Sequence, residues 1–342
     1  MQYLSRAPLR VSFAGGGTDV SPYPETAGGA VLSVAINRFC RAVLAPRRDG
    51  LVFVRSLDYG VSHVFPIDRV PDLTGPLALT GAVLRAAGDL GSGLDLVSAS
   101  EAAPGSGLGA SSALVVAILG AVRAWQGRPW TNAQLAELAY RVERIDLGLS
   151  GGRQDQYAAV FGGLNFLEFL PGRTIVNRLQ LPRGVDDGLK ASLLLCYTGK
   201  GHPNEDLIGQ QVASFRAGER KVVAALEHLK ELAVVMKQAL ERGDLESFAG
   251  LLAQGWEHKK ALADGISDPA IDRMYQAALD AGALGGKLLG SGGGGHLLLF
   301  CPPSSRARVV GAVQGHGCRE VPFDFSPGGV EATISGGDPV AS

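Results

Sequence analysis

Apolar positions alternate along parts of the chain and recur at helical spacing along others, which predicts a mixture of strands and helices. Residues 9–13 (LRVSF) alternate and predict a strand, whereas 219–242 has apolar residues three and four positions apart and predicts a helix. The same criteria predict strands at 30–44, 51–57, 94–99, 163–169 and 193–198, and helices at 77–88, 111–126, 132–145, 155–160, 205–217, 244–263, 268–282 and 304–316. The elements follow no regular βαβ rhythm, so the pattern favours an α+β fold over a doubly wound sheet.

The length of the chain predicts two domains. At 342 residues it exceeds what one hydrophobic core usually supports. The segment 171–188 is richer in proline, glycine, arginine and aspartate than its surroundings, which is typical of a domain boundary. We therefore expect an N-terminal domain over 1–188 and a C-terminal domain over 189–342.

The composition argues against two classes of partner. Hydrophobic residues make up 46% of the chain, charged residues make up 19%, and the formal net charge is −1. Nucleic acids and membrane surfaces attract proteins with a basic excess, so neither is an expected partner. No apolar run approaches the length of a membrane span, and the opening residues lack the layout of a secretory signal. The four scattered cysteines form no CxxC pair, which predicts buried thiols and a cytoplasmic location.

Glycine is both abundant and clustered. The chain holds 48 glycines, which gather at 15–17, 105–109, 148–152 and 290–295 without a regular period. Clusters of this kind mark places where the backbone turns tightly or approaches a ligand closely. The last cluster has five glycines in six residues, more than a hairpin turn needs, although a flexible turn is the alternative. We expect this loop to allow a close approach of substrate.

The stretch PGSGLGASSA at 104–113 connects a predicted strand to a strongly apolar predicted helix. Its glycines leave backbone N–H groups free to face a ligand, and a helix N-terminus carries partial positive charge and unpaired donors. Phosphate is the natural occupant of such a site. The loop lacks the lysine of a Walker loop and the GxGxxG of a dinucleotide fingerprint. The alternative is a tight turn in which Ser111 or Ser112 caps the helix.

Two further motifs accompany this loop, and the three together resemble those of a known family. Residues 8–19 read PLRVSFAGGGTD, and 287–295 read KLLGSGGGG. With PGSGLGASSA, they resemble the signature motifs of the GHMP small-molecule kinases, over nearly the whole chain. Within that superfamily, 7–23 (APLRVSFAGGGTDVSPY) and 151–166 (GGRQDQYAAVFGGLNF) resemble the sugar-1-kinases that act on D-glycero-D-manno-heptose 7-phosphate. L-fucose kinase domains are similar as well.

The resemblance implies a fold, an activity and two cofactors. It implies a ribosomal protein S5 domain 2-like N-terminal domain, a ferredoxin-like C-terminal domain and an active site between them. The implied activity is transfer of a phosphoryl group from ATP, with Mg²⁺, to the anomeric hydroxyl of this sugar phosphate, for nucleotide-heptose and surface glycan biosynthesis. The alternatives are an L-fucose-type sugar-1-kinase and a non-catalytic sensor of sugar and ATP. The oligomeric state, monomer or homodimer, stays open.

The resemblance also implies which residues hold ATP and the metal. The implied ATP-phosphate loop comprises Pro104, Gly105, Ser106, Gly107, Leu108, Gly109, Ala110, Ser111 and Ser112. Ser111 occupies the family's magnesium-binding position, with Ser112 as the adjacent alternative. Glu143 is the second expected ligand, on the next predicted helix. Without the family pattern, Glu143 would be expected to pair with Arg144 or Arg141 on a solvated face.

Three residues are expected to serve the chemistry. Family relatives have their catalytic aspartate where this chain has Asp155, which would accept the proton of the attacking hydroxyl. Arg10, the basic residue of the first motif, would pair with Asp155 and keep it ionised. Arg153 is a second candidate cation, for a phosphate of ATP or of the substrate. The alternative for Asp155 is an ordinary aspartate in the first turn of a helix, where it complements the helix dipole.

The sugar is expected to lie against two glycine loops. The expected contacts are Gly16, Gly17, Thr18, Asp19, Gly292 and Gly293. Asp19 would accept hydrogen bonds from sugar hydroxyls, whereas Lys287 is expected to have a structural role.

A sugar that already carries a phosphate needs basic groups at the far end of its pocket. The candidates are Lys200 and His202 in the sequence YTGKGHP, with Arg38 and Arg41 behind them. The alternative for this segment is a solvated loop.

Overall fold

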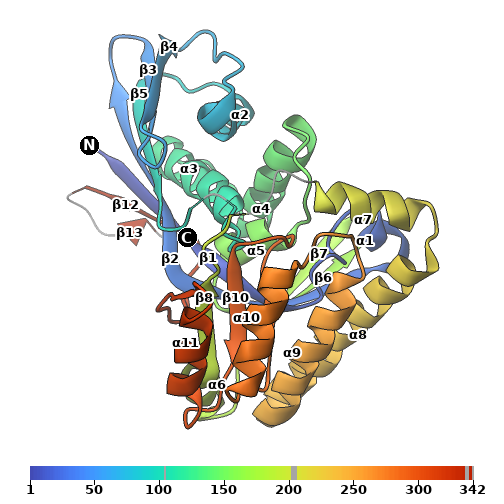
Figure 1. Cartoon of the computed structure of the whole chain (residues 1–342). Helices are drawn as coiled ribbons and strands as arrows, with labels where there is room; N and C mark the ends of the chain where they lie inside the picture. Colours follow the sequence, from blue (N-terminus) through green and yellow to red (C-terminus); the bar gives the residue numbers. More distant parts are fainter. Residues whose placement is uncertain (104, 202–205, 336–338, 341–342) are drawn as a thin grey trace.

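Two β-sheets organise the fold of this computed structural model (Figure 1), which describes residues 1–103, 105–201, 206–335 and 339–340. In these residues, the larger sheet has the strand order β13-β12-β1-β2-β5-β3-β4, and β6 and β7 extend it from β2. Its strands are β1 (Tyr3–Ala14), β2 (Gly29–Arg47), β3 (Leu51–Ser56), β4 (Val61–Pro66), β5 (Gly93–Ser100), β6 (Leu164–Leu170), β7 (Arg173–Arg178), β12 (Glu331–Ile334) and β13 (Pro339–Val340). The long strand β2 pairs with β1, β5 and β6 and so joins the arms of the sheet.

Helices from the first half of the chain accompany this sheet. They are α1 (Tyr23–Ala27), a 3-10 turn (Gly75–Leu77), α2 (Ala78–Ala87), α3 (Ala110–Gln126), α4 (Asn132–Tyr140), a π-helical turn (Arg141–Asp146) and α5 (Gln154–Phe161). The helix α3 packs against β1 and β2 and buries apolar residues such as Val115, Val116 and Leu119, as expected for a helix that is hydrophobic on most sides. Its N-terminus therefore begins at a fixed place beside the first strand.

The smaller sheet is antiparallel throughout its described strands, in the order β11-β8-β10-β9. Its strands are β8 (Leu193–Tyr197), β9 (Gly285–Leu288), β10 (His296–Phe300) and β11 (Arg319–Glu320). The helices of this half are α6 (Val185–Ser192), α7 (Leu207–Arg216), α8 (Arg220–Arg242), α9 (Leu245–Lys260), α10 (Pro269–Asp280) and α11 (Arg306–Gln314). In Figure 1, α8 and α9 run as a neighbouring pair, and α9 packs against β9.

The two halves share a hydrophobic core. Phe13 of β1 meets Phe248 of α9 edge to face, with ring centroids 5.2 Å apart and an interplanar angle of 82°. Phe248 in turn contacts Phe300 of β10. All three side chains belong to the same buried cluster, so the second sheet and its helices are held against the first strand of the chain.

The prediction of an α+β fold is confirmed, whereas several elements were not predicted. Strand β7 lies inside the segment expected to be a boundary, and β12 returns from the end of the chain to pair with β1. The chain passes from the larger to the smaller sheet between β7 and β8, and the boundary at residue 188 stays a prediction. The predicted helix at 132–145 is also divided, because α4 gives way to the π-helical turn.

The expectation of buried cysteine thiols is confirmed. All four cysteines are buried and free of disulfide bonds. In the part of the chain that the structure describes, no helix is both long enough and apolar enough to cross a membrane.

Candidate active site

A cavity of about 360 Å³ lies where the glycine loops of both halves converge. One part of its wall is the loop before α3, and another is Asp155 with the segment that precedes α5. Residues from the second half close it, among them Gln211, Lys259, Lys287 and Gly290. The cavity therefore collects residues that are far apart in the sequence.

The loop before α3 is held in place by its close approach to the glycine cluster at 290–295. Gly107 has a φ of +79°, and a Cβ there would lie 2.6 Å from the carbonyl oxygen of Leu289. A Cβ on Gly295 would lie 2.7 Å from the carbonyl oxygen of Ser106. Side chains at either position would force the two loops apart. The glycine cluster thus packs against this loop, and its expected close approach to substrate stays a prediction.

The N-terminus of α3 is left open toward the cavity. Gly109 is the N-cap residue, and no side chain caps the helix within the described residues, so the alternative of a turn capped by Ser111 or Ser112 is wrong. Ser111 lines the cavity and Ser112 is buried beneath it. An uncapped helix N-terminus beside a cavity presents unpaired N–H groups and positive potential, which suits a phosphate group. Pro104, at the start of the predicted loop, lies outside the described residues.

Glu143 is a buried carboxylate beneath this helix. It accepts hydrogen bonds from the Ser111 hydroxyl and, at 2.5 Å, from Nε2 of Gln156, and Arg144 Nη1 lies 3.8 Å from it. The alternative of a solvated face is wrong, because the Glu143 side chain has no exposed surface. The reason is the π-helical turn over Arg141–Asp146, which changes the direction in which successive side chains point. Arg141 instead pairs with Asp146.

Ser111 and Glu143 could hold a magnesium ion. A hydroxyl and a carboxylate are the hard oxygen ligands that Mg²⁺ prefers, and this metal usually takes its remaining ligands from phosphates and water. The buried carboxylate of Glu143 has Arg144 Nη1 at 3.8 Å, so a metal ion would add favourable positive charge beside it. Across the described residues, no group of three or more histidine, cysteine, aspartate or glutamate side chains could hold a metal. The residues present therefore fit an ion shared with a phosphate ligand.

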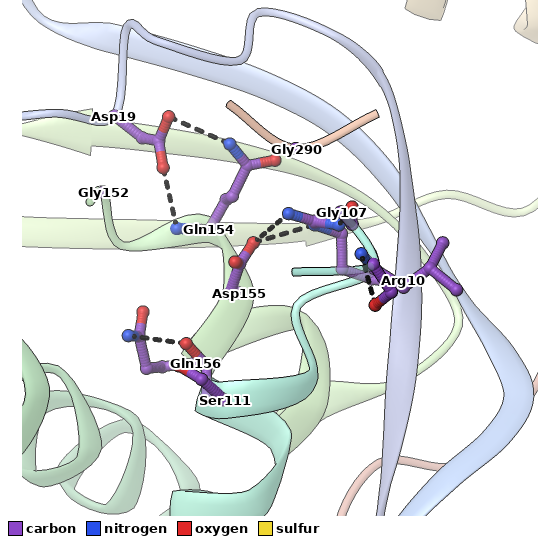
Figure 2. A network of polar contacts seen from close by, with 12 residues as sticks. Arg10, Asp19, Gly107, Ser111, Gly152, Gln154, Asp155, Gln156 and Gly290 are labelled. Atoms are coloured by element: carbon purple, nitrogen blue, oxygen red, sulfur yellow. Dashed lines mark hydrogen bonds and ion pairs between the residues drawn. The ribbon is translucent and has the colours of Figure 1, made fainter. Parts of the chain in front are cut away.

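Arg10 and Asp155 form a partly buried ion pair in the wall of the cavity (Figure 2). Both Nε and Nη2 of Arg10 lie 2.7 Å from Oδ1 of Asp155, and Nη1 donates a 2.6 Å hydrogen bond to the carbonyl oxygen of Gly107. Gly109 packs against the pair, because a Cβ there would lie 3.2 Å from Cγ of Asp155. The first strand, the loop before α3 and the first turn of α5 are thus joined by one arginine. Among the described residues, no hydrogen bond engages Oδ2 of Asp155, which leaves that oxygen for a ligand.

Asp19 fixes the residue that precedes Asp155. It accepts hydrogen bonds from the backbone N–H and from Nε2 of Gln154, each at 3.0 Å (Figure 2). It also accepts one from the N–H of Gly17 at 3.1 Å. Burial raises the pKa of Asp19, and the nearby charge of Asp155 adds to this, while the backbone hydrogen bonds oppose it. Gly152 makes room for this carboxylate, since a Cβ there would lie 2.0 Å from Oδ2 of Asp19.

Arg153, predicted as a cation for a phosphate, is not among the residues that line the cavity. Its guanidinium lies 4.3 Å from the ring centroid of Tyr140 and pairs with Glu25 at 3.4 Å and Glu137 at 3.6 Å. Arg144 lines the cavity instead and donates hydrogen bonds to carbonyl oxygens of the segment before α5. Sequence reasoning missed Arg144 in this role because the π-helical turn that redirects it has no local signature.

The expected sugar contacts divide into two groups. Gly16, Gly17 and Asp19 line the cavity. Thr18 does not, because it is fully buried and its hydroxyl bonds to the carbonyl oxygens of Gly15 and Ala30. Gly292 and Gly293 are also absent from the lining; they pack against the backbone of Ile266.

Of the residues predicted to bind a substrate phosphate, the three that the structure describes are not among those that line the cavity. Lys200 is half-exposed and pairs with Asp268 at 3.2 Å. Arg38 donates to the carbonyl oxygen of Pro322, and Arg41 pairs with Glu101. His202 lies outside the described residues. The lysines that do line the cavity are Lys259, which the sequence did not single out, and Lys287, which was expected to be structural.

Comparison with known proteins identifies the family. Residues 77–163 match the GHMP kinases N terminal domain, and residues 236–317 match the GHMP kinases C terminal domain. The chain is 33% identical over 333 residues to a D-glycero-alpha-D-manno-heptose 7-phosphate kinase of Campylobacter jejuni, covering 96% of this chain and 98% of that protein. This chain belongs to the GHMP kinases. It therefore has the two-domain α+β fold of that family and is a sugar kinase.

Solved structures of GHMP kinases agree with this fold. A structure described as a D-glycero-D-manno-heptose 1-phosphate kinase from Bacteriodes thetaiotaomicron is 32% identical, with a TM-score of 0.81 and coverage of 97% of this chain and 99% of that one. The galactokinase of Lactococcus lactis is 17% identical, with a TM-score of 0.80 and coverage of 96% and 94%, and shares the fold. As a GHMP kinase, the chain uses ATP.

The space beside Gly152 generates a prediction about catalysis. In Gly152→Ala the new Cβ would overlap the Asp19 carboxylate, displace Gln154 and misplace the neighbouring Asp155. We expect kcat to fall about 100-fold, since a displacement of about 1 Å costs that much at a reacting centre. The matched control is Gly311→Ala in α11, where a Cβ meets no atom within 4 Å. Wild-type kcat in a folded Gly152→Ala protein would remove Asp19 from the positioning of Asp155.

Proposed function

We propose that this GHMP kinase transfers the γ-phosphoryl group of ATP to the anomeric hydroxyl of D-glycero-D-manno-heptose 7-phosphate, producing the 1,7-bisphosphate and ADP. The observation that carries the proposal is the Arg10–Asp155 pair beside the open N-terminus of α3, in one cavity. The substrate is inferred from the heptose kinase relative, which aligns over nearly its full length. The product would supply nucleotide-heptose and surface glycan synthesis, and we place the reaction in the cytoplasm.

The lining of the cavity suits both substrates. Tyr59, Pro76 and Leu79 are part of it and would offer apolar surface to the base of ATP. The loop before α3 is also part of it, and its backbone N–H groups would hold the phosphates. Gly16, Gly17 and Asp19 would contact the sugar. In the proposed arrangement the attacked phosphorus would lie between ATP and the sugar, as an in-line displacement requires.

Asp155 acts as the base in the proposed mechanism. Its Oδ2 accepts the proton of the anomeric hydroxyl as that oxygen forms a bond to the γ-phosphorus, and the bond from this phosphorus to the bridging oxygen of ADP breaks. Arg10 holds Oδ1 from two nitrogens, so that the carboxylate keeps one orientation. The N-terminus of α3 favours the negative charge on the transferred phosphoryl group.

Ser111 and Glu143 would hold Mg²⁺ in this proposal. The ion, when bound, neutralises charge on the β- and γ-phosphate oxygens. Gln156 supports Glu143 and the serine next to Ser111, because its Nε2 donates to Glu143 at 2.5 Å and to the Ser112 hydroxyl at 3.0 Å. This contact keeps the carboxylate oriented toward Ser111.

The substrate is tested by ADP release with ATP, Mg²⁺ and a panel of sugars. The panel holds D-glycero-D-manno-heptose 7-phosphate, the same heptose without phosphate, sedoheptulose 7-phosphate, mannose 6-phosphate, L-fucose and galactose. We expect strong turnover on the heptose 7-phosphate alone. Turnover on L-fucose would replace the substrate, in line with the 29% identity to an L-fucokinase/L-fucose-1-P guanylyltransferase of Bacteroides fragilis, of whose length this chain spans 35%. ATP binding without turnover on any sugar would contradict the proposed reaction.

Removing the charge of Asp155 tests its role as the base. Asp155→Asn keeps the shape of the side chain but cannot accept the proton, so we expect kcat to fall at least about 100-fold. ATP affinity should stay within threefold of the wild-type value, because Asp155 does not touch the nucleotide in this mechanism. Steady-state kinetics and equilibrium titration with ATP separate the two effects. A kcat close to the wild-type value would assign the proton to another acceptor.

The two serines of the loop make a matched pair for the metal. Ser111→Ala removes a proposed ligand, and we expect the Mg²⁺ concentration for half-maximal rate to rise about tenfold at fixed ATP. Ser112→Ala, which removes a hydroxyl bonded to Gln156, should change this concentration less than threefold. The opposite order in a Mg²⁺ titration of the two variants would transfer the ligand role to Ser112.

A further inference from the structure

Two buried lysines line the cavity from the second half of the chain. Lys259 is the penultimate residue of α9, and Lys287 lies in β9. Their exposed fractions are 7% and 4%. Nζ of Lys259 donates to the carbonyl oxygens of Leu288 at 2.9 Å and Gly290 at 2.5 Å. Nζ of Lys287 donates to the carbonyl oxygen of Phe13 at 3.2 Å. An ammonium group has three N–H donors, so these contacts leave three of six without a described acceptor.

The positive charge of these lysines is not balanced by a carboxylate. None of the ion pairs among the described residues includes either lysine. The charges that act on Lys259 are those of Lys287 and Arg10, and Arg10, which is itself paired with Asp155, acts on Lys287. Burial, with repulsion from Arg10, lowers the pKa of Lys287 to about 7, and burial with repulsion from Lys287 and Arg10 lowers that of Lys259. A buried ammonium without a counter-ion is costly. The wall therefore has a capacity for negative charge that the protein itself does not fill.

We propose that Lys259 and Lys287 form a binding site for a phosphate group in the wall of the cavity. Hydrogen bonds to carbonyl oxygens alone do not account for lysine at these two positions. An apolar side chain at either position would avoid the free-energy cost of a buried charge. The site rests on the proposed function, which supplies two sources of phosphate: the group that the sugar already carries, and the γ-phosphoryl group of ATP. Its position beside Arg10 and Gly290 adjoins both.

The two sources are distinguished by equilibrium binding to the full chain. Calorimetric titrations would use the heptose with and without its 7-phosphate, and AMPPNP against ADP, with wild-type protein and Lys287→Met. A sugar-phosphate site predicts at least tenfold weaker binding of the heptose 7-phosphate to the variant, with free heptose and both nucleotides unchanged. A γ-phosphoryl site predicts a tenfold loss for AMPPNP but not for ADP. The matched control is Lys260→Met, at the half-exposed neighbour that pairs with Glu257.

The proposal is overturned if a folded Lys287→Met protein binds heptose 7-phosphate, free heptose, AMPPNP and ADP with affinities within twofold of wild type. The lysines would then only donate hydrogen bonds to backbone carbonyl oxygens. Lys287→Arg, which keeps the charge, should recover most of the loss of affinity.

If Lys287→Met does not fold, the uptake of protons by the wild-type protein at pH 8 tests the site instead. A bound, fully ionised phosphate should raise the pKa of the lysines, so that the protein takes up protons from the buffer when it binds. Proton uptake that is equal for heptose 7-phosphate and free heptose, and equal for AMPPNP and ADP, contradicts the site. Failure of the proposed function gives a different result, because neither form of the heptose would then bind to the wild-type protein. In that case the comparison of AMPPNP with ADP binding still tests whether the lysines bind a phosphate.

Discussion

The ion pair between Arg10 and Asp155 is the contact on which the rest of the site depends. Two charges with little exposed surface are stable only when each satisfies the other, so the pair fixes the distance between the first strand and the first turn of α5. The third arginine nitrogen holds Gly107, which sets the loop before α3 relative to the same carboxylate. The proposed base and the proposed phosphate site are therefore positioned by one side chain.

Charge is distributed around the cavity in a way that suits phosphoryl transfer. Carboxylates of the first half, Asp19, Glu143 and Asp155, are each restrained by hydrogen bonds. Positive potential comes from the N-terminus of α3 and from the lysines of the second half. Since phosphoryl transfer depends on positioning and on neutralising charge more than on covalent help, a rigid arrangement of this kind is what the reaction requires. The shared aromatic core around Phe13 and Phe248 provides the rigidity.

The sequence was sufficient for the parts of the structure that local patterns encode. Periodicity predicted the α+β class and most helices, and the glycine motifs predicted the loops that meet at the cavity. Arg153 and Arg144 show where such reasoning fails, because the contacts that place Arg144 in the cavity lining and Arg153 beside Tyr140 are tertiary ones. Lys259 and Lys287 are 28 positions apart in the numbering and meet only through tertiary packing, and the return of β12 to β1 also depends on long-range pairing. No local pattern carries that information.

The most direct test of the central claim is a crystal structure of the full chain with AMPPNP, Mg²⁺ and D-glycero-D-manno-heptose 7-phosphate. The decisive distance joins the anomeric oxygen of the sugar to Oδ2 of Asp155. The account predicts a separation of about 2.6–3.2 Å, with the γ-phosphorus of AMPPNP on the other side of that oxygen. An anomeric hydroxyl that contacts a different base, with Arg10 and Asp155 still paired but remote from the sugar, would contradict it.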